Sequence, residues 1–198
     1  MGLERYWTYQ QFRLTDHLTL FVNLYNGNLV AQYDEFAIPS RGLPLMFNHT
    51  FNSRAYRADA VGYNWTHSLG YRLVDRGDNT VAVSDGDGTE LLFTYPSNGV
   101  YVSPPGNLDT LTRAGNTFTL THKDQSQHIF ARNVGSTWLP TQIQDRSGNA
   151  ITLAYDASNR LTNATSASSG QTLTLTYNAN GKLASVADNA GHTLTYQY

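Results

Sequence analysis

Residues 151–155 read Ile151-Thr152-Leu153-Ala154-Tyr155, and similar segments return at 173–177 (Leu-Thr-Leu-Thr-Tyr) and at 194–198 (Leu-Thr-Tyr-Gln-Tyr). A leucine opens each unit, at positions 139, 161 and 183, so the spacing is 22 residues. Each leucine is followed 8 or 9 residues later by a glycine. A fixed period of this length is typical of arrays whose units cannot bury their own apolar faces. The sequence therefore predicts a surface or an enclosure built from repeats, and it does not predict a catalytic cleft.

Apolar residues alternate with Thr or Ala inside each repeat. One face of each predicted strand is therefore apolar and buried (the dry face), and the other is partly exposed to solvent. The tyrosine at each strand end has a ring to bury and a hydroxyl that can reach a backbone group. Asp side chains at the turns can accept hydrogen bonds from backbone N–H groups two residues on. We therefore expect a structural ladder, without catalytic, cofactor or metal roles, formed by Leu139, Tyr155, Asp156, Leu161, Tyr177, Leu183 and Tyr198.

The rest of the chain shows strand patterns every 8 to 12 residues, with turn residues between them, such as Asn26-Gly27-Asn28. Only Leu3–Phe12 is compatible with a helical turn. We predict an all-β fold in which consecutive antiparallel hairpins form a curved, extended sheet. Two regions are expected, 1–138 and a repeat region 139–198 that is cut off at its C-terminal end.

The composition excludes several function classes. Only 14% of the 198 residues are charged, the net charge is -2, and there is no Cys. A basic excess for nucleic-acid binding is missing, as are thiols for disulfides, catalysis or metal binding. Apolar stretches are too short for a transmembrane helix. The basic residues Arg41, Arg54, Arg57 and Arg72 are too dispersed for a nucleic-acid patch.

Two sets of residues carry a family resemblance. The repeat Tyr155-Asp156-Ala157-Ser158-Asn159-Arg160-Leu161 resembles the YD repeat of Rhs proteins, and the next copy begins at Tyr177-Asn178. The front of the chain resembles the region that precedes these repeats in Rhs and wall-associated proteins, through residues 22–30, 39–45, 51–54, 62–65 and 85–88 with Phe93. The resemblance implies a sheet that spirals into a hollow shell, which encloses a C-terminal toxin or serves adhesion in teneurins. It brings no enzyme site to these residues.

Four groups of residues have an alternative chemical interpretation. Asp85-Gly86-Asp87-Gly88 can be a calcium loop or a plain hairpin turn, and His122 with His128 can hold a metal or form a cross-strand polar pair. The acids at 145, 156 and 188 can be catalytic carboxylates or turn caps. Aromatic side chains that suit sugar stacking are Tyr6, Trp7, Tyr9, Trp65 and Trp138. The structural interpretation is favoured in each case.

The sequence thus predicts a non-catalytic segment of a YD-repeat β-shell that encapsulates or presents a downstream toxin or effector. The alternative is a cell-surface adhesion or carbohydrate-binding module. The expected partners are the downstream part of the same polypeptide and, in the alternative, a carbohydrate or a surface receptor; no cofactor, nucleic acid or membrane span is expected. We expect a secreted or cell-surface location, and self-association through an unpaired edge strand.

Overall fold

The computed structural model describes residues 2–4, 6–40, 42–95 and 100–198, and all their regular elements are β-strands. The predicted all-β fold built from consecutive antiparallel hairpins is confirmed. In the described part of the chain, no helix has the length and apolar character that crossing a membrane requires. Two expected turn positions, Arg41 and Ser97–Gly99, lie outside the described residues.

The strands form three sheets. The first sheet has the order β1-β2-β3-β4-β7, with β1 (Tyr9–Arg13), β2 (Leu18–Asn23), β3 (Leu29–Ile38), β4 (Leu45–Asn52) and β7 (Trp65–His67). A short two-stranded hairpin consists of β5 (Ala58–Asp59) and β6 (Gly62–Tyr63).

The third sheet has 13 strands and takes up the rest of the chain. Its first part consists of β8 (Arg72–Asp75), β9 (Thr80–Ser84), β10 (Glu90–Thr94), β11 (Val100–Tyr101), β12 (Thr110–Ala114), β13 (Thr117–Thr121) and β14 (Gln127–Val134). The repeats supply β15 (Thr137–Gln144), β16 (Ala150–Tyr155), β17 (Leu161–Ser166), β18 (Thr172–Tyr177), β19 (Leu183–Asp188) and β20 (Thr193–Thr195).

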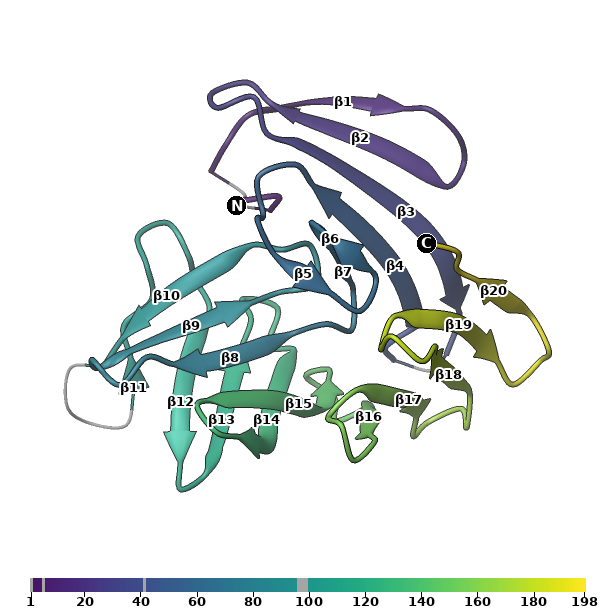
Figure 1. Ribbon diagram of the computed structural model, residues 1–198. Coiled ribbons are helices and arrows are strands. Elements are labelled where there is room, and N and C mark those ends of the chain that lie inside the picture. The colour runs from purple at the N-terminus through teal and green to yellow at the C-terminus, as the bar shows by residue number, and fades with distance from the viewer. Residues whose placement is uncertain (1, 5, 41, 96–99) are drawn as a thin grey trace.

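The large sheet curves around the first one. An unbroken antiparallel path runs from β11 to β20, and β8 joins it by pairing with β15. Figure 1 shows this path passing below β4 and then turning up, so that β19 and β20 come close to the C-terminal half of β3. The boundary between the first sheet and the large sheet lies between His67 and Arg72. The expected start of the repeats at residue 139 falls within β15, inside the large sheet.

Two buried clusters of apolar residues form the core. One lies within the region β8–β15 and is centred on Phe93, Phe118 and Phe130, each 0% exposed. The other joins Leu45 and Phe47 of β4 to the apolar face of the repeats, which includes Leu161, Leu173, Leu183 and Val186. The repeats therefore bury their dry face against the first sheet.

The N-terminal segment differs from its prediction. A helical turn over Leu3–Phe12 is wrong from Tyr9 onward, because residues 9–13 pair with β2 in regular antiparallel register. Pairing with a neighbouring strand overrides the weak local helix preference of this segment.

Candidate functional site

The turns of the repeats are built alike. In the first, Asp145 Oδ1 accepts from the backbone N–H groups of Ser147 (2.8 Å) and Asn149 (2.9 Å). Asp156 Oδ1 does the same for Ser158 and Arg160, both at 2.9 Å. Corresponding pairs of bonds are made by Asn178 and Asp188.

The residue three positions after each Asp or Asn has positive φ, with values of 82° at Gly148, 62° at Asn159, 73° at Gly181 and 96° at Gly191. Glycine adopts this conformation freely, and Asn tolerates it better than most residues. The carboxylates at 145, 156 and 188 thus cap hairpin turns. Hydrogen bonds to the ionised form lower the pKa of all three carboxyls.

The tyrosines at the strand ends reach back to the start of the preceding strand, near the leucine that opens their own unit. The Tyr155 hydroxyl donates to the Pro140 carbonyl oxygen at 2.7 Å, and the Tyr177 hydroxyl donates to the Leu161 carbonyl oxygen at 2.7 Å. The Tyr198 hydroxyl lies 3.0 Å from the Leu183 carbonyl oxygen and 3.2 Å from that of Ala60. Burial raises the pKa of the Tyr155 and Tyr177 hydroxyls, which keeps them protonated as donors.

Two leucines of the expected ladder, Leu161 and Leu183, lie on the dry face, where they are 5% and 1% exposed in the shared cluster. Leu139 is half-buried and lies outside that cluster. Asp156 accepts from the Arg160 guanidinium at 2.7 Å, and that guanidinium lies 4.8 Å from the centre of the Tyr177 ring. The structure thus brings turn, tyrosine and leucine of neighbouring repeats together.

We predict that Tyr177→Phe lowers the free energy of unfolding by about 1 kcal/mol, because the Leu161 carbonyl loses its hydrogen-bond donor while the ring stays packed. Urea denaturation measures the change. Tyr25→Phe is the matched control, since Tyr25 is 78% exposed and the same atom is removed there without effect. Equal free energies of unfolding for the two variants would show that the Tyr177 hydroxyl does not stabilise the fold.

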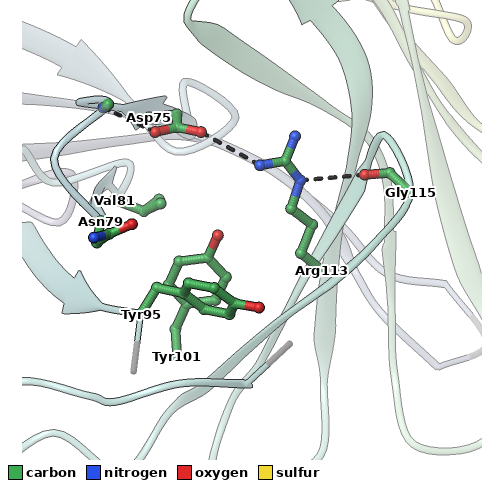
Figure 2. A pocket seen from close by; sticks show the side chains of 8 residues that line it. Asp75, Asn79, Val81, Tyr95, Tyr101, Arg113 and Gly115 are labelled. Atoms are coloured by element: carbon green, nitrogen blue, oxygen red, sulfur yellow. Dashed lines mark hydrogen bonds and ion pairs between the residues drawn. The ribbon is translucent and has the colours of Figure 1, made fainter. Parts of the chain in front are cut away.

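A second candidate site is a surface groove of about 420 Å³ at the far end of the large sheet. Figure 2 shows the rings of Tyr95 and Tyr101 side by side, with centres 5.0 Å apart, near an ion pair between Asp75 and Arg113 at 3.4 Å. Arg113 Nε–H also donates to the Gly115 carbonyl oxygen at 3.2 Å. Flat rings beside fixed polar groups suit a sugar or another polar, planar ligand.

The aromatic residues singled out in the sequence do not gather at this groove. Trp138 is 5% exposed and donates from Nε1 to the Asn116 carbonyl oxygen, and Trp65 packs on Phe51. Trp7 stacks on Tyr25 at 4.5 Å near the N-terminus. The sequence did not single out Tyr95 and Tyr101, because an aromatic residue in a predicted strand is ordinarily core; Tyr101 is 6% exposed and belongs to the β8–β15 cluster, and Tyr95 packs against it.

The two histidines of the β13–β14 hairpin form a polar pair. His122 Nε2 lies 2.9 Å from His128 Nδ1, and His122 Nδ1 lies 3.1 Å from Asp109 Oδ2. Burial, followed by the His122 charge, lowers the pKa of His128 to about 3. One nitrogen of the facing pair donates to the other, so this pair occupies the atoms that a bridging metal would need.

The Asp85 loop is the turn between β9 and β10. Asp85 Oδ1 accepts from the backbone N–H groups of Asp87 (3.1 Å) and Thr89 (3.0 Å), as in the repeat turns. Burial and the Asp87 charge raise the pKa of the Asp85 carboxyl well above its usual value. Among the described residues no group of three or more His, Cys, Asp or Glu is placed to hold a metal ion.

Comparison with known proteins adds a family match and three relatives. Residues 21–93 match a family described as a domain of unknown function, DUF6531. Over 162 residues, 82% of this chain, the sequence is 28% identical to the tRNA nuclease WapA of Bacillus subtilis strain 168 and to the tRNA3(Ser)-specific nuclease WapA of Bacillus spizizenii. A tRNA(Glu)-specific nuclease WapA of Bacillus subtilis subsp. natto is equally similar. The aligned part makes up 7%, 7% and 6% of these relatives, so the chain spans a small fraction of their length.

These matches correct one prediction. The sequence predicted a protein that is not an enzyme, and this is contradicted because all three relatives are named as tRNA nucleases. That prediction rested on the absence of a recognised catalytic motif within 198 residues, which says nothing about polypeptides many times longer. The matches agree with the broad family that the sequence resembles.

Proposed function

We propose that the chain forms the opening wall of a YD-repeat β-shell in a secreted or cell-surface protein with tRNA-nuclease activity. The wall encloses or presents the effector that carries this activity, and the region 139–198 is the start of the repeats. Support comes from the similarity to tRNA nucleases of the WapA type and from the family match over residues 21–93.

One observation carries the proposal. The repeats pair into one uninterrupted antiparallel path, and each strand-end tyrosine bonds to a carbonyl of the preceding strand. A wall whose backbone groups are paired offers few sites for a protease, which must bind extended, unpaired chain. Such a wall keeps an enclosed effector from digestion and from early action. The tRNA-directed activity belongs to the effector in this proposal, and the wall itself needs no contact with nucleic acid.

The test uses the polypeptide that carries both this chain and the effector. Limited proteolysis should leave the effector intact in the wild type, and it should cut the effector when Tyr155 and Tyr177 are both replaced by Ser. Tyr25→Ser is the control, because Tyr25 is exposed and lies outside the repeats. Digestion of the effector at the same rate in the wild-type polypeptide and in isolation would contradict the proposal that the wall encloses it.

The outer edge of β20 suggests how the wall continues. Tyr196 N–H donates to Ala184 O and Asp188 N–H donates to His192 O, so by alternation the N–H groups of Thr193 and Thr195 point away from β19. In the described part of the chain no strand pairs with that side of β20. An unpaired edge is a template for another strand. We propose that it pairs with further repeats of the same polypeptide or with a second copy.

For the 198-residue chain alone, this edge predicts dimers that form as concentration rises, measured by sedimentation velocity. Thr195→Pro removes an outward N–H donor and should shift the equilibrium toward monomer. A wild type that stays monomeric at all concentrations, or a variant that dimerises equally well, contradicts pairing at this edge.

The groove of Tyr95, Tyr101, Asp75 and Arg113 favours a second candidate function, the binding of a surface carbohydrate. The supporting observation is the pair of neighbouring tyrosine rings beside an ion pair (Figure 2). A glycan array should then give binding that Tyr95→Ala abolishes and that Tyr56→Ala, at an exposed residue outside the groove, leaves unchanged. Binding to no glycan removes this candidate.

A further inference from the structure

A cavity of about 430 Å³ lies where the first half of the chain meets the repeats. The β5–β6 hairpin and the β7–β8 connection form one side, and the turns after β16 and β18 form the other. The two sides are tied together by Leu183 N–H, which donates to Ala60 O at 2.9 Å, and by the Lys182 ammonium, which donates to Asp59 O at 2.8 Å. The cavity is thus a built feature of the fold.

The charges that line this cavity do not balance. Among the lining residues, Asp59 carries a negative charge. Four lining residues carry a positive charge: Arg57, Arg72, Arg160 and Lys182. Asp59 pairs with Arg57 at 2.7 Å, and Arg160 pairs with Asp156, which lies outside the lining. Two positive charges, those of Arg72 and Lys182, are left without a carboxylate partner.

Arg72 is the clearest case. Its guanidinium makes no hydrogen bond or ion pair with any residue that the structure describes, and its Nε is buried without a partner. Burial, followed by the charge of Arg57, lowers the pKa of Arg72, and Asp59 and Glu90 offset this only in part. A desolvated guanidinium beside another cation is unfavourable unless an anion joins it.

Two further buried nitrogens of residues that line this cavity have no hydrogen-bond partner. His67 is 6% exposed, and its Nδ1 is buried without a hydrogen bond. Arg57 Nε is likewise buried and unpaired. A buried polar group without a partner is unfavourable, so an acceptor that drew any of these side chains into a hydrogen bond would stabilise the fold.

We propose that this cavity binds a dianionic phosphate group, held by Arg72, Arg57, Lys182 and the imidazole of His67. Guanidinium groups bind the oxygens of such anions through paired, charge-assisted hydrogen bonds. A phosphate monoester carries about -1.5 to -2 charge at pH 7, which matches the two uncompensated positive charges. The rings of Tyr155 and Tyr177 form an adjacent wall on which an organic substituent of the phosphate can pack.

This site stands on the cavity alone, and it holds whether or not the wall encloses an effector. Free phosphate and an esterified phosphate present the same group, so the experiment must separate them. Phenyl phosphate binds more tightly than inorganic phosphate if the ligand is an ester that uses the tyrosine wall. Equal binding of the two assigns the site to free phosphate.

The test titrates the full chain with inorganic phosphate by calorimetry and follows its melting temperature. Wild type should bind phosphate and melt at a higher temperature in its presence. Arg72→Gln should weaken binding at least about tenfold, since the charge-assisted hydrogen bonds of the guanidinium to the phosphate are lost. In phosphate-free buffer the same variant should melt at or above the wild-type temperature, because a buried charge without a partner has been removed.

Arg76→Gln is the matched control, because that arginine binds Glu90 at 2.7 Å and does not line the cavity. Its phosphate affinity should equal that of the wild type. Lys182→Gln tests the same site from the repeat side should Arg72→Gln fail to fold. Acetate, which carries a single charge, should bind more weakly than phosphate. The proposal is overturned if phosphate neither binds nor raises the melting temperature, if acetate binds as tightly, or if the cavity variants bind like Arg76→Gln.

Discussion

The hairpins of the repeats depend on one side-chain oxygen in each turn. At positions 145, 156, 178 and 188, an Asp or Asn Oδ1 accepts two backbone N–H groups, and the residue three positions later takes a left-handed conformation. This arrangement fixes the length of the loop, and loop length fixes the register of the strands that follow. A slip of one residue would turn every buried leucine of a repeat to solvent. The turn therefore determines which face of the wall is dry.

The tyrosines act on the next level, between neighbouring strands. A register shift occurs between Ala154 and Tyr155 and again between Thr176 and Tyr177, so that each tyrosine lies opposite the leucine that begins the next strand, Leu161 or Leu183. A bulge of this kind re-aims one side chain and increases the local twist. The register shift thus brings Leu161 and Leu183 onto the buried face of the sheet.

Sequence patterns predicted the strands that follow each turn, since residues 151–155 and 173–177 alternate strictly. The strands that begin at Leu161 and Leu183 were not predicted, because their buried positions are three residues apart, at Leu161 and Ala164 and at Leu183 and Val186. Bulges break the two-residue period, so the pattern looks irregular. Local turn chemistry was readable because it involves neighbours in sequence.

The cationic cavity was not predictable from the sequence. Arg57 and Arg72 looked too dispersed for a site, yet pairing of β8 with β15 and docking of the β5–β6 hairpin on the repeats bring them to the Lys182 turn. Contacts across more than a hundred residues are set by which faces pack together, and a single sequence does not encode that in any local pattern.

The shared apolar cluster explains why the two halves of the chain need each other. The dry face of the repeats packs on β3 and β4, through Phe36, Leu45 and Phe47. These three residues lie inside the segment 21–93 that matches a known family. Repeats cannot bury their own faces, so the first unit of an array needs a partner that covers its apolar surface. The five-stranded sheet supplies that surface here, and antiparallel strand pairing then continues the sheet from one repeat to the next.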